Sequence, residues 1–244
     1  MRLAERVAIV TGDVAGLGRL CALALAREGA CVVIAEPQHT KSDAIAAEVR
    51  AAGGDATSIS TDMTDETSVR ALMRGTLVRY GRLDILVNKP MLPPQPLPRP
   101  FDEVPVEEWD AQLAANVRGI FLSCKAAAAT LRAQRSGKII NIVSTAFDLG
   151  EPNTLPIVAS MGAIVGLTRG IASELGGFGV NVNALAHGPV PDMSLAPQRE
   201  ISGQALDHRP TFDDLLGALI FLASPDSDFM TGQTLRVDGG SSYR

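Results

Sequence analysis

Short runs of apolar residues alternate with longer segments of helical periodicity along the whole chain. The predicted strands are Val7–Val10, Cys31–Ala35, Thr57–Ser60, Ile85–Val87, Lys138–Val143, Val180–Ala184 and Leu235–Val237. The predicted helices are Gly18–Glu28, Lys41–Ala52, Glu66–Tyr80, Val106–Ala133, Leu155–Leu175 and Phe212–Leu222. Several strands are continuous apolar runs, which is typical of strands covered on both faces. The pattern predicts an α/β fold, a doubly wound parallel sheet of seven strands flanked by helices.

The length of 244 residues suits a single domain, and no linker or internal repeat interrupts the pattern. One segment departs from the alternation of strands and helices, because six prolines fall between Pro90 and Pro100. Proline cannot donate to a sheet ladder or continue a helix interior. We therefore expect a stiff, partly polyproline-like loop after the fourth strand.

Composition narrows the class of protein further. Apolar residues make up 46% of the chain and charged residues 20%, which excludes disordered and collagen-like classes. The 22 Lys and Arg residues are outnumbered by 27 Asp and Glu residues, giving a net charge of −5. Nucleic-acid binding needs a clustered basic surplus, so no nucleic-acid partner is expected.

The three cysteines, Cys21, Cys31 and Cys124, are too few and too widely spaced for a disulfide framework. No Cys or His cluster has the spacing of zinc ligands, so we expect no metal and interpret the cysteines as small core residues. The N-terminus lacks the features of a signal peptide, and no apolar run approaches the length of a membrane span. The expected location is cytoplasmic, without membrane insertion.

A glycine-rich turn follows the first strand and opens the first helix, as TGDVAGLG over residues 11–18. Glycines at such a turn let the backbone approach a pyrophosphate, and the helix N-terminus supplies unpaired N–H groups. Glu36 stands twenty residues beyond Gly16, at the end of the second strand, where a carboxylate can bind an adenosine ribose. A carboxylate there repels a 2′-phosphate, so the sequence predicts NAD rather than NADP.

Several motifs occur in the order of one family. TGDVAGLG matches the family's TGxxxGxG, and Asp62, followed by Met63, matches the acidic residue that contacts adenine. Three further motifs match: YGRLDILVN, which ends in Asn88, ANVRG, which contains Asn116, and IINIVS, which ends in Ser144. Over essentially its whole length the chain resembles the short-chain dehydrogenase/reductase (SDR) family. The resemblance implies a Rossmann-type fold, with a nucleotide-binding half over about residues 1–90 and a catalytic half over 91–244. It also implies cofactor contacts from Gly12, Gly16, Leu17, Gly18, Glu36, Asp62, Met63 and Asn88.

The chain departs from this family at the catalytic dyad. In the family a Tyr follows the Ser by thirteen residues, and a Lys follows the Tyr by four; here those positions hold Ile157 and Met161. The flanking SMGAIVGLTRGIASEL keeps the family register, and neither Tyr80 nor Tyr243 has a Lys four residues on. The sequence therefore predicts a degenerate active site without the Tyr-x-x-x-Lys dyad.

Neighbouring positions have changed too. The family's NNAG is here Asn88-Lys89-Pro90-Met91, and its PG is His187-Gly188, followed by PVPD. The remaining candidate catalytic residues are Ser144, Asn116 and His187. Ser144 either polarises a carbonyl or is bonded to backbone. In the family Asn116 bends its helix and holds a water of the proton relay, and without the dyad we expect mainly the structural role. His187 is a titratable group beside the expected nicotinamide, and the ordinary alternative is a histidine that is hydrogen-bonded to the backbone. Lys89, which follows the fourth strand, is expected to be solvated.

Three hypotheses follow. The protein binds NAD(H) but has lost alcohol/ketone hydride transfer, acting as a pseudoenzyme or regulator. Alternatively, it transfers hydride by an unorthodox route in which water or His187 supplies the proton. In the third, the fold serves non-redox chemistry, such as dehydration, isomerisation or cyclisation of a hydrophobic carbonyl compound. The resemblance also implies a homodimer or homotetramer through the helices Val106–Ala133 and Leu155–Leu175, and a hetero-oligomer with an active paralogue is an alternative. The small-molecule substrate is not indicated.

Overall fold

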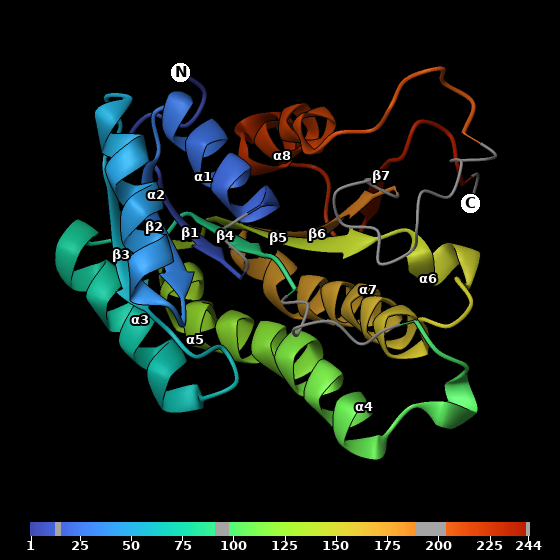
Figure 1. Ribbon diagram of the computed structural model, residues 1–244. Helices are drawn as coiled ribbons and strands as arrows, with labels where there is room; N and C mark the ends of the chain where they lie inside the picture. Colours follow the sequence, from blue (N-terminus) through green and yellow to red (C-terminus); the bar gives the residue numbers. More distant parts are fainter. Residues whose placement is uncertain (13–15, 91–97, 189–203, 243–244) are drawn as a thin grey trace.

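Seven parallel strands form one sheet in the computed structural model, which describes residues 1–12, 16–90, 98–188 and 204–242 (Figure 1). The strands are β1 (Val7–Thr11), β2 (Cys31–Glu36), β3 (Ala56–Ser60), β4 (Ile85–Asn88), β5 (Gly137–Ser144), β6 (Val180–His187) and β7 (Thr234–Val237). Their order across the sheet is β3-β2-β1-β4-β5-β6-β7. Because the order reverses direction between β1 and β4, the sheet is doubly wound, which confirms the predicted fold class.

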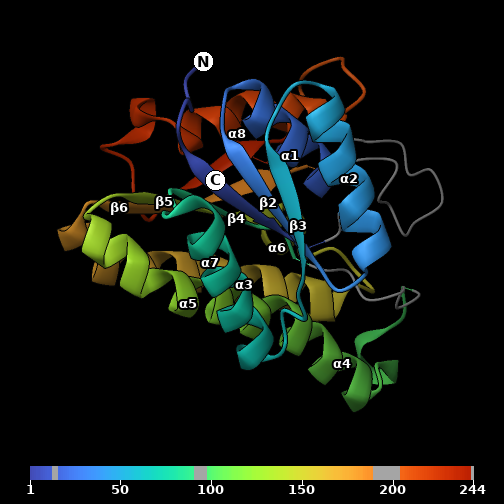
Figure 2. The ribbon, with the colours of Figure 1, turned by 90° about the vertical axis from the view of Figure 1, so that its left-hand side faces the viewer.

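Helices cover both faces of the sheet. They are α1 (Leu17–Arg27), α2 (His39–Ala51), α3 (Glu66–Tyr80), α4 (Val106–Leu113), α5 (Gly119–Gln134), α6 (Ala146–Leu149), α7 (Leu155–Leu175) and α8 (Leu216–Ala223). Helices α1, α2 and α8 lie on one face, and α3, α5 and α7 lie on the other (Figures 1 and 2). Short 3₁₀ helices are η1 (Phe101–Glu103), η3 (Gly176–Phe178), η5 (Phe212–Leu215) and η6 (Pro225–Ser227). The predicted alternation of strands and helices is thus confirmed.

Each face of the sheet buries its own apolar cluster. Val10 of β1 belongs to the cluster under α1, α2 and α8, whereas its neighbour Ile9 belongs to the cluster under α3, α5 and α7. Successive side chains of a strand point to opposite faces, so both faces of β1 are covered. This double burial is the physical reason why the strands are continuous apolar runs in the sequence.

Helix α7 is the core helix of the second face. Leu155–Phe178 is the only helical stretch of the described residues long and apolar enough to cross a membrane. Its Ile164, Ala172 and Leu175 are buried in the cluster against the sheet. Packing against the sheet therefore accounts for the apolar residues on the buried face of this helix.

The structure corrects the predicted helix Val106–Ala133. It consists of α4 and α5 joined by one π-helical turn, η2 (Ala114–Arg118), which contains Asn116. Such turns interrupt the i→i−4 ladder and bend a helix, as the resemblance implies for Asn116. Helix α6 was not predicted, because its four residues are too few to show periodicity. Most of the predicted proline-rich loop (residues 91–97) lies outside the described residues.

Candidate active site

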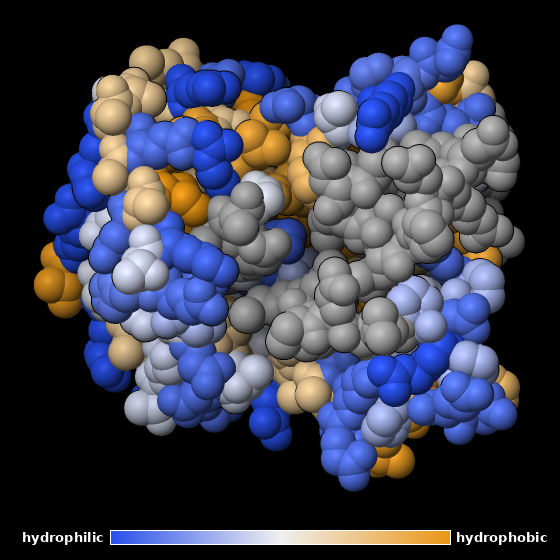
Figure 3. All heavy atoms as spheres, in the orientation of Figure 1, coloured by the Kyte–Doolittle hydropathy of each residue, from blue (hydrophilic) through white to orange (hydrophobic). Residues whose placement is uncertain are grey.

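Four residues of interest lie where neighbouring strands end. Gly12 follows β1, Lys89 follows β4, and Ser144 and His187 are the last residues of β5 and β6. In a doubly wound sheet, ligands bind outside the carboxyl ends of the strands, at the point where the strand order reverses. These residues therefore mark the end of the sheet at which this fold type binds its ligands. In Figure 3, which shows one face of the molecule, most of the coloured residues around the periphery are hydrophilic.

Gly12 makes a turn that only glycine can make. Its φ is +86°, and an added Cβ would lie 2.1 Å from the carbonyl oxygen of Lys89. Beyond it, Gly16 precedes α1 without a capping side chain, and Leu17 and Gly18 open the helix. The first amides of a helix lack intrahelical acceptors and attract anions such as phosphate. Residues 13–15 of the motif lie outside the described residues.

Glu36 ends β2 as predicted, and the residue is 5% exposed. Asp62 is exposed, and its Oδ1 accepts hydrogen bonds from the backbone N–H and the hydroxyl of Thr64, at 2.8 and 2.7 Å. These bonds fix the carboxylate of Asp62 in an Asx-type turn. Met63 is buried with Val69 in a small apolar cluster.

The side chain of Asn88 is committed to the protein interior. Its Nδ2 donates to Asn141 Oδ1 at 2.9 Å, and its Oδ1 accepts from the Ser123 hydroxyl at 2.7 Å. Asn141 in turn donates to the Thr168 hydroxyl at 2.9 Å. This buried polar row joins β4 and β5 to the helices α5 and α7. The side chain of Asn88 therefore holds these elements together. Only its backbone is available for the cofactor contact predicted for this residue.

Ser144 and His187 are register partners on adjacent strands. The Ser144 hydroxyl accepts from the N–H of Ala146 at 3.2 Å, and the N–H of Thr145 donates to the carbonyl of His187 at 2.9 Å. The hydroxyl of Thr145 is fully buried and has no hydrogen-bond partner among the described residues. A buried polar atom normally has a partner, so this hydroxyl has unused hydrogen-bonding capacity next to Ser144.

His187 is a neutral, buried imidazole. Its Nδ1 lies 2.8 Å from the carbonyl oxygen of Gly188, so Nδ1 carries the proton and Nε2 is left as an acceptor. Burial lowers the pKa of His187, and the nearby ammonium of Lys89 lowers it further, against the opposing effect of the Gly188 hydrogen bond. The expectation that Lys89 is solvated was wrong: the residue is 5% exposed. Its close packing behind Gly12 explains the burial.

Ile157 and Met161 lie one turn apart on α7, and both pack into the second apolar cluster. Met161 is 3% exposed and Ile157 is half-buried. Next to them, the Ser160 hydroxyl accepts from Asn116 Nδ2 at 3.1 Å and donates to the carbonyl of Ile157 at 2.9 Å. This stretch of α7 therefore presents apolar side chains, with Asn116 tied to it from the π turn.

The residues at this edge fit a dinucleotide. The cradle at Gly12 has no room for a side chain, the start of α1 offers free amides, and Glu36 ends the neighbouring strand. These are the features that bind a pyrophosphate and an adenosine ribose. For a metal ion the described residues contain no group of three or more His, Cys, Asp or Glu side chains.

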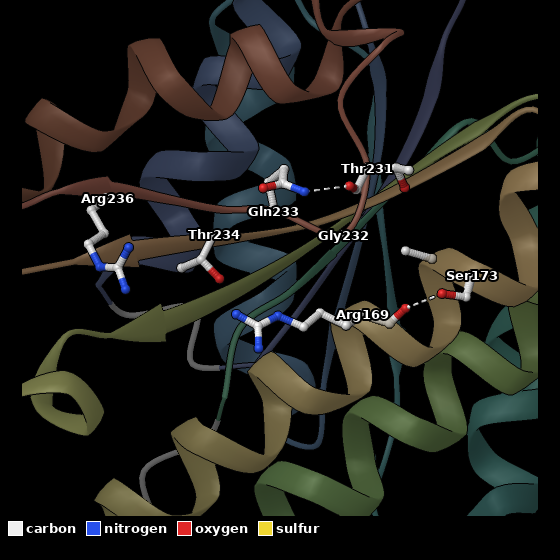
Figure 4. Close-up of a pocket in the computed structure, with 8 residues that line it drawn as sticks. Arg169, Ser173, Thr231, Gly232, Gln233, Thr234 and Arg236 are labelled. Carbon is white, nitrogen blue, oxygen red and sulfur yellow. Dashed lines mark hydrogen bonds between the residues drawn. The ribbon is translucent and has the colours of Figure 1, made fainter. Parts of the chain in front are cut away.

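A cavity of about 580 Å³ lies beside β7, the last strand of the sheet, and none of the predicted site residues lines it (Figure 4). Its lining comes from α7, β7 and the preceding loop and consists of Arg169, Ala172, Ser173, Thr231, Gly232, Gln233, Thr234 and Arg236. Arg236 is held there by a bidentate pair with Asp148, at 2.8 and 3.2 Å. The side chain of Asp148 is 10% exposed, so this ion pair is largely enclosed.

Comparison with known proteins decides the family. A family model described as enoyl-(acyl carrier protein) reductase matches residues 12–242. A 3-oxoacyl-[acyl-carrier-protein] reductase of Synechocystis is 35% identical over 98% of this chain and 97% of its own length. The chain belongs to the short-chain dehydrogenase/reductase family.

Two further SDR relatives support this membership. The 3-oxoacyl-[acyl-carrier-protein] reductase FabG of Staphylococcus aureus is 35% identical over 96% of both chains. A (2S)-[(R)-hydroxy(phenyl)methyl]succinyl-CoA dehydrogenase subunit, BbsD of Thauera aromatica, is 34% identical over 99% of this chain and 98% of its own. The chain is thus an SDR-family oxidoreductase by descent, and a nicotinamide nucleotide is the cofactor to which this family points.

Sequence reasoning missed three features of this SDR site. They are the Thr145 hydroxyl and the fully buried Gln112 amide, neither of which has a hydrogen-bond partner among the described residues, and the burial of Lys89. The features at Thr145 and Lys89 follow from packing between distant segments. A signal existed for Gln112, because it occurs four residues before Asn116 and so shares its helix face.

Proposed function

We propose that this SDR-family protein binds NAD(H) and has lost most of the hydride transfer between alcohols and ketones that its relatives' names describe. The observation that carries the proposal is the apolar pair on α7, where Ile157 and Met161 occupy the Tyr and Lys positions. Met161 is 3% exposed and packs within the second apolar cluster, an environment that disfavours a charged ammonium.

The chemical consequence follows from the charge that develops during the reaction. When bound, the nicotinamide would supply a hydride to the carbonyl carbon of the substrate, and the negative charge would then develop on the carbonyl oxygen, which needs a proton. A positioned general acid contributes about 10²–10⁴ in rate, roughly 3–5 kcal/mol of barrier. Ser144 retains the hydroxyl of the family's serine position, and a serine hydroxyl serves as a hydrogen-bond donor or acceptor rather than as a general acid.

Glu36 supports NAD over NADP. Its carboxylate ends β2, where it can accept hydrogen bonds from two ribose hydroxyls. A 2′-phosphate at the same place would put two negative charges beside a buried carboxylate. Glu36 therefore selects against the phosphorylated nucleotide.

Calorimetric titration with NADH and with NADPH tests the proposal. We expect NADH to bind in the micromolar range, about −8 kcal/mol, and NADPH to bind at least tenfold more weakly. With a 3-oxoacyl thioester present, oxidation of bound NADH should be slow or absent. Absence of heat and of thermal stabilisation with either nucleotide overturns nucleotide binding, whereas rapid NADH oxidation overturns the loss of hydride transfer.

An unorthodox dehydrogenase is the second candidate, and the state of His187 favours one direction of it. Burial favours the neutral imidazole, and its Nε2 has no hydrogen-bond donor among the described residues, so it suits a base that accepts a proton from an alcohol. Donating a proton to a ketone would first require charging a buried ring. If this route operates, alcohol oxidation by NAD should exceed ketone reduction and should vanish in His187→Asn.

We also propose self-association through the outer face of α7. Gly162, Gly166 and Gly170 lie one turn apart on this face, and a Cβ added at any of them meets no atom within 4 Å. Phe121 of α5 is 46% exposed although it is a large apolar side chain. The arrangement suits close packing against a second copy, giving a homodimer or homotetramer. Light scattering of the purified protein, alone and with an active paralogue, distinguishes a homo-oligomer from a hetero-oligomer.

A further inference from the structure

Charged residues are distributed unequally over the carboxyl ends of the seven strands. In the order of the sheet, the residues that end or closely follow the strands are Asp62, Glu36, Gly12, Lys89, Ser144, His187 and Asp238. Carboxylates occupy the β3 and β2 side, and Lys89, directly after β4, is the only lysine or arginine of this series. Gly12 separates the two, at the point where the strand order reverses.

The ammonium of Lys89 is enclosed beside α1. The residue is 5% exposed, its carbonyl and Cβ lie against Gly12, and its Nζ donates to the carbonyl of Pro90 at 3.4 Å. Burial raises the pKa of the Cys21 thiol of α1 to about 12, and the charge of Lys89 opposes this shift. Burial lowers the pKa of His187, and the same charge lowers it further. The ammonium is therefore close to both α1 and the end of β6.

Lys89 does not take the place of the lysine that the family carries on α7. Met161, at that position, belongs to the apolar cluster under α3, α5 and α7. Cys21, whose thiol senses the charge of Lys89, belongs to the cluster under α1, α2 and α8. Because the two positions lie on opposite faces of the sheet, the effect of Lys89 on a ligand follows from its own surroundings.

The proposed dinucleotide would meet this charge with its second half. With the adenosine ribose at Glu36 and the pyrophosphate at the start of α1, the second nucleotide would extend over the ends of β4, β5 and β6. The pyrophosphate is anionic in both redox forms, whereas the nicotinamide ring carries a positive charge only in NAD⁺. A cation at the end of β4 therefore attracts the part that both forms share and repels the ring of one form. Burial strengthens this repulsion, because water does not screen the charge.

The carboxylate of Asp238 is the opposing charge on this side of the sheet. It accepts hydrogen bonds from the N–H groups of Gly240 and Ser242, both at 3.0 Å, and from the hydroxyl of Ser242 at 2.6 Å. These bonds engage the carboxylate within its own turn. The end of β5 is one strand from Lys89 and two strands from Asp238, so the cation is the nearer charge there.

We propose that Lys89 makes the nucleotide site select NADH over NAD⁺, so that the protein responds to the reduced form of the nucleotide. The inference rests on the proposed binding of NAD(H) and specifies its redox form. It opposes the second candidate function, because oxidation of an alcohol requires bound NAD⁺.

Calorimetric titration of the unmodified protein with NADH, NAD⁺ and ADP-ribose is the direct test. ADP-ribose keeps the adenosine and both phosphates but lacks the nicotinamide ring. NAD⁺ should bind roughly tenfold more weakly than ADP-ribose, because repulsion between two partly buried unit charges is worth at least that factor. NADH should bind at least as tightly as ADP-ribose. NAD⁺ that binds as tightly as ADP-ribose overturns the selection alone, whereas binding of none of the three overturns nucleotide binding and the selection with it.

The variant Lys89→Met removes the charge and keeps a long apolar side chain. The ratio of the Kd for NAD⁺ to the Kd for NADH should fall roughly tenfold. Lys125→Met, at an exposed lysine of α5 paired with Glu66, is the matched control and should leave the ratio unchanged. A merely structural role of Lys89 would weaken both forms alike, so an unchanged ratio in folded Lys89→Met overturns the proposal. If that variant does not fold, the comparison with ADP-ribose in the unmodified protein decides.

Discussion

Ser144 and His187 lie opposite each other at the ends of β5 and β6, and the amide after Ser144 is bonded to the carbonyl of His187 at 2.9 Å. The backbone thus fixes the two candidate catalytic residues relative to each other, independently of α7. The changes at Ile157 and Met161 therefore leave this part of the site in place. Under the proposed function, this part of the site lacks the family's proton donor on α7 and carries a buried imidazole at the end of β6.

The first prediction concerns the pH dependence of stability at His187. Its pKa in the folded protein is lowered by burial and by the charge of Lys89, whereas the unfolded chain has a pKa of about 6.5. Below pH 6.5 the unfolded state binds a proton that the folded state does not, so stability falls as pH decreases. Its contribution is complete above pH 6.5. We expect urea unfolding of His187→Asn to lose less stability between about pH 7 and pH 5 than the unmodified protein.

His39→Asn serves as the control for this comparison, because His39 is an exposed histidine on α2. The difference between the unmodified protein and this control should not change in the same way with pH. Parallel pH profiles for His187→Asn and the unmodified protein would show that His187 does not resist protonation.

The second prediction tests the cradle at Gly12. Gly12 and Gly53 have nearly equal φ values, +86° and +87°, but an added Cβ meets the Lys89 carbonyl only at Gly12 and no atom within 4 Å at Gly53. Gly53→Ala should therefore cost only the left-handed strain, about 1–2 kcal/mol. Gly12→Ala should cost about 3 kcal/mol or more, because overpacking adds to that strain, and should also weaken NADH binding. Equal losses in urea unfolding would contradict the close approach of Lys89.

The third prediction concerns Asp84, which directly precedes β4 and so lies at the amino ends of the strands, opposite the candidate site. Its carboxylate accepts from the N–H of Val7 at 3.0 Å and from the guanidinium groups of Arg6 and Arg82. Burial raises the pKa of Asp84, but the bonds from Arg82, Val7 and Arg6 outweigh it and leave the pKa below its usual value. Asp84→Asn should lose about 1.5–3 kcal/mol near neutral pH, since hydrogen bonds to a charged group are lost.

The pH dependence has a definite sign here. The stability that ionised Asp84 contributes is complete above the unfolded pKa of about 3.9 and is lost as pH falls through the lower folded pKa. Asp84→Asn should therefore approach the unmodified protein in stability under acidic conditions. Asp207→Asn, at an exposed aspartate, should have little effect at any pH. A similar small effect at Asp84 would show that its ion pairs do not stabilise the fold.

The fold was predictable because its main signal is local. The continuous runs at β1 and β4, and the glycine at residue 12, are visible in the sequence because double burial and a left-handed turn restrict the residue types. The bounds of α3 and α7 were predicted without error, since both have clear periodicity and, at α3, an Asp65 cap bonded to two amides. Fold class followed from their alternation.

The site was predictable only in part, because it depends on contacts between distant segments. The predicted strands ended at Val143 and Ala184, so the sequence placed Ser144 and His187 after their strands and gave no indication of their mutual register. Nothing in the local pattern indicates that Asn88 turns its amide towards Asn141, 53 residues away. Likewise, the burial of Lys89 results from its approach to Gly12. Local periodicity cannot report which side chains meet across elements.

The last prediction concerns restoration of the dyad. In the double variant Ile157→Tyr with Met161→Lys, a phenol and an ammonium stand one turn apart on α7, where the phenol can act as general acid. Because Met161 is 3% exposed, Met161→Lys alone should destabilise the protein. If only the dyad is missing, the double variant should oxidise NADH with a 3-oxoacyl thioester at least about 10² times faster than the unmodified protein.

Ile157→Phe with Met161→Lys is the matched control, since it differs from the double variant only by the phenolic hydroxyl. It should show no such gain, which assigns the rate to the proton donor rather than to the new cation or to ring packing. A folded double variant that binds NADH without gaining turnover would contradict the prediction. In that case the changed residues at the ends of β4 and β6, Lys89 and His187, must also have remodelled the site.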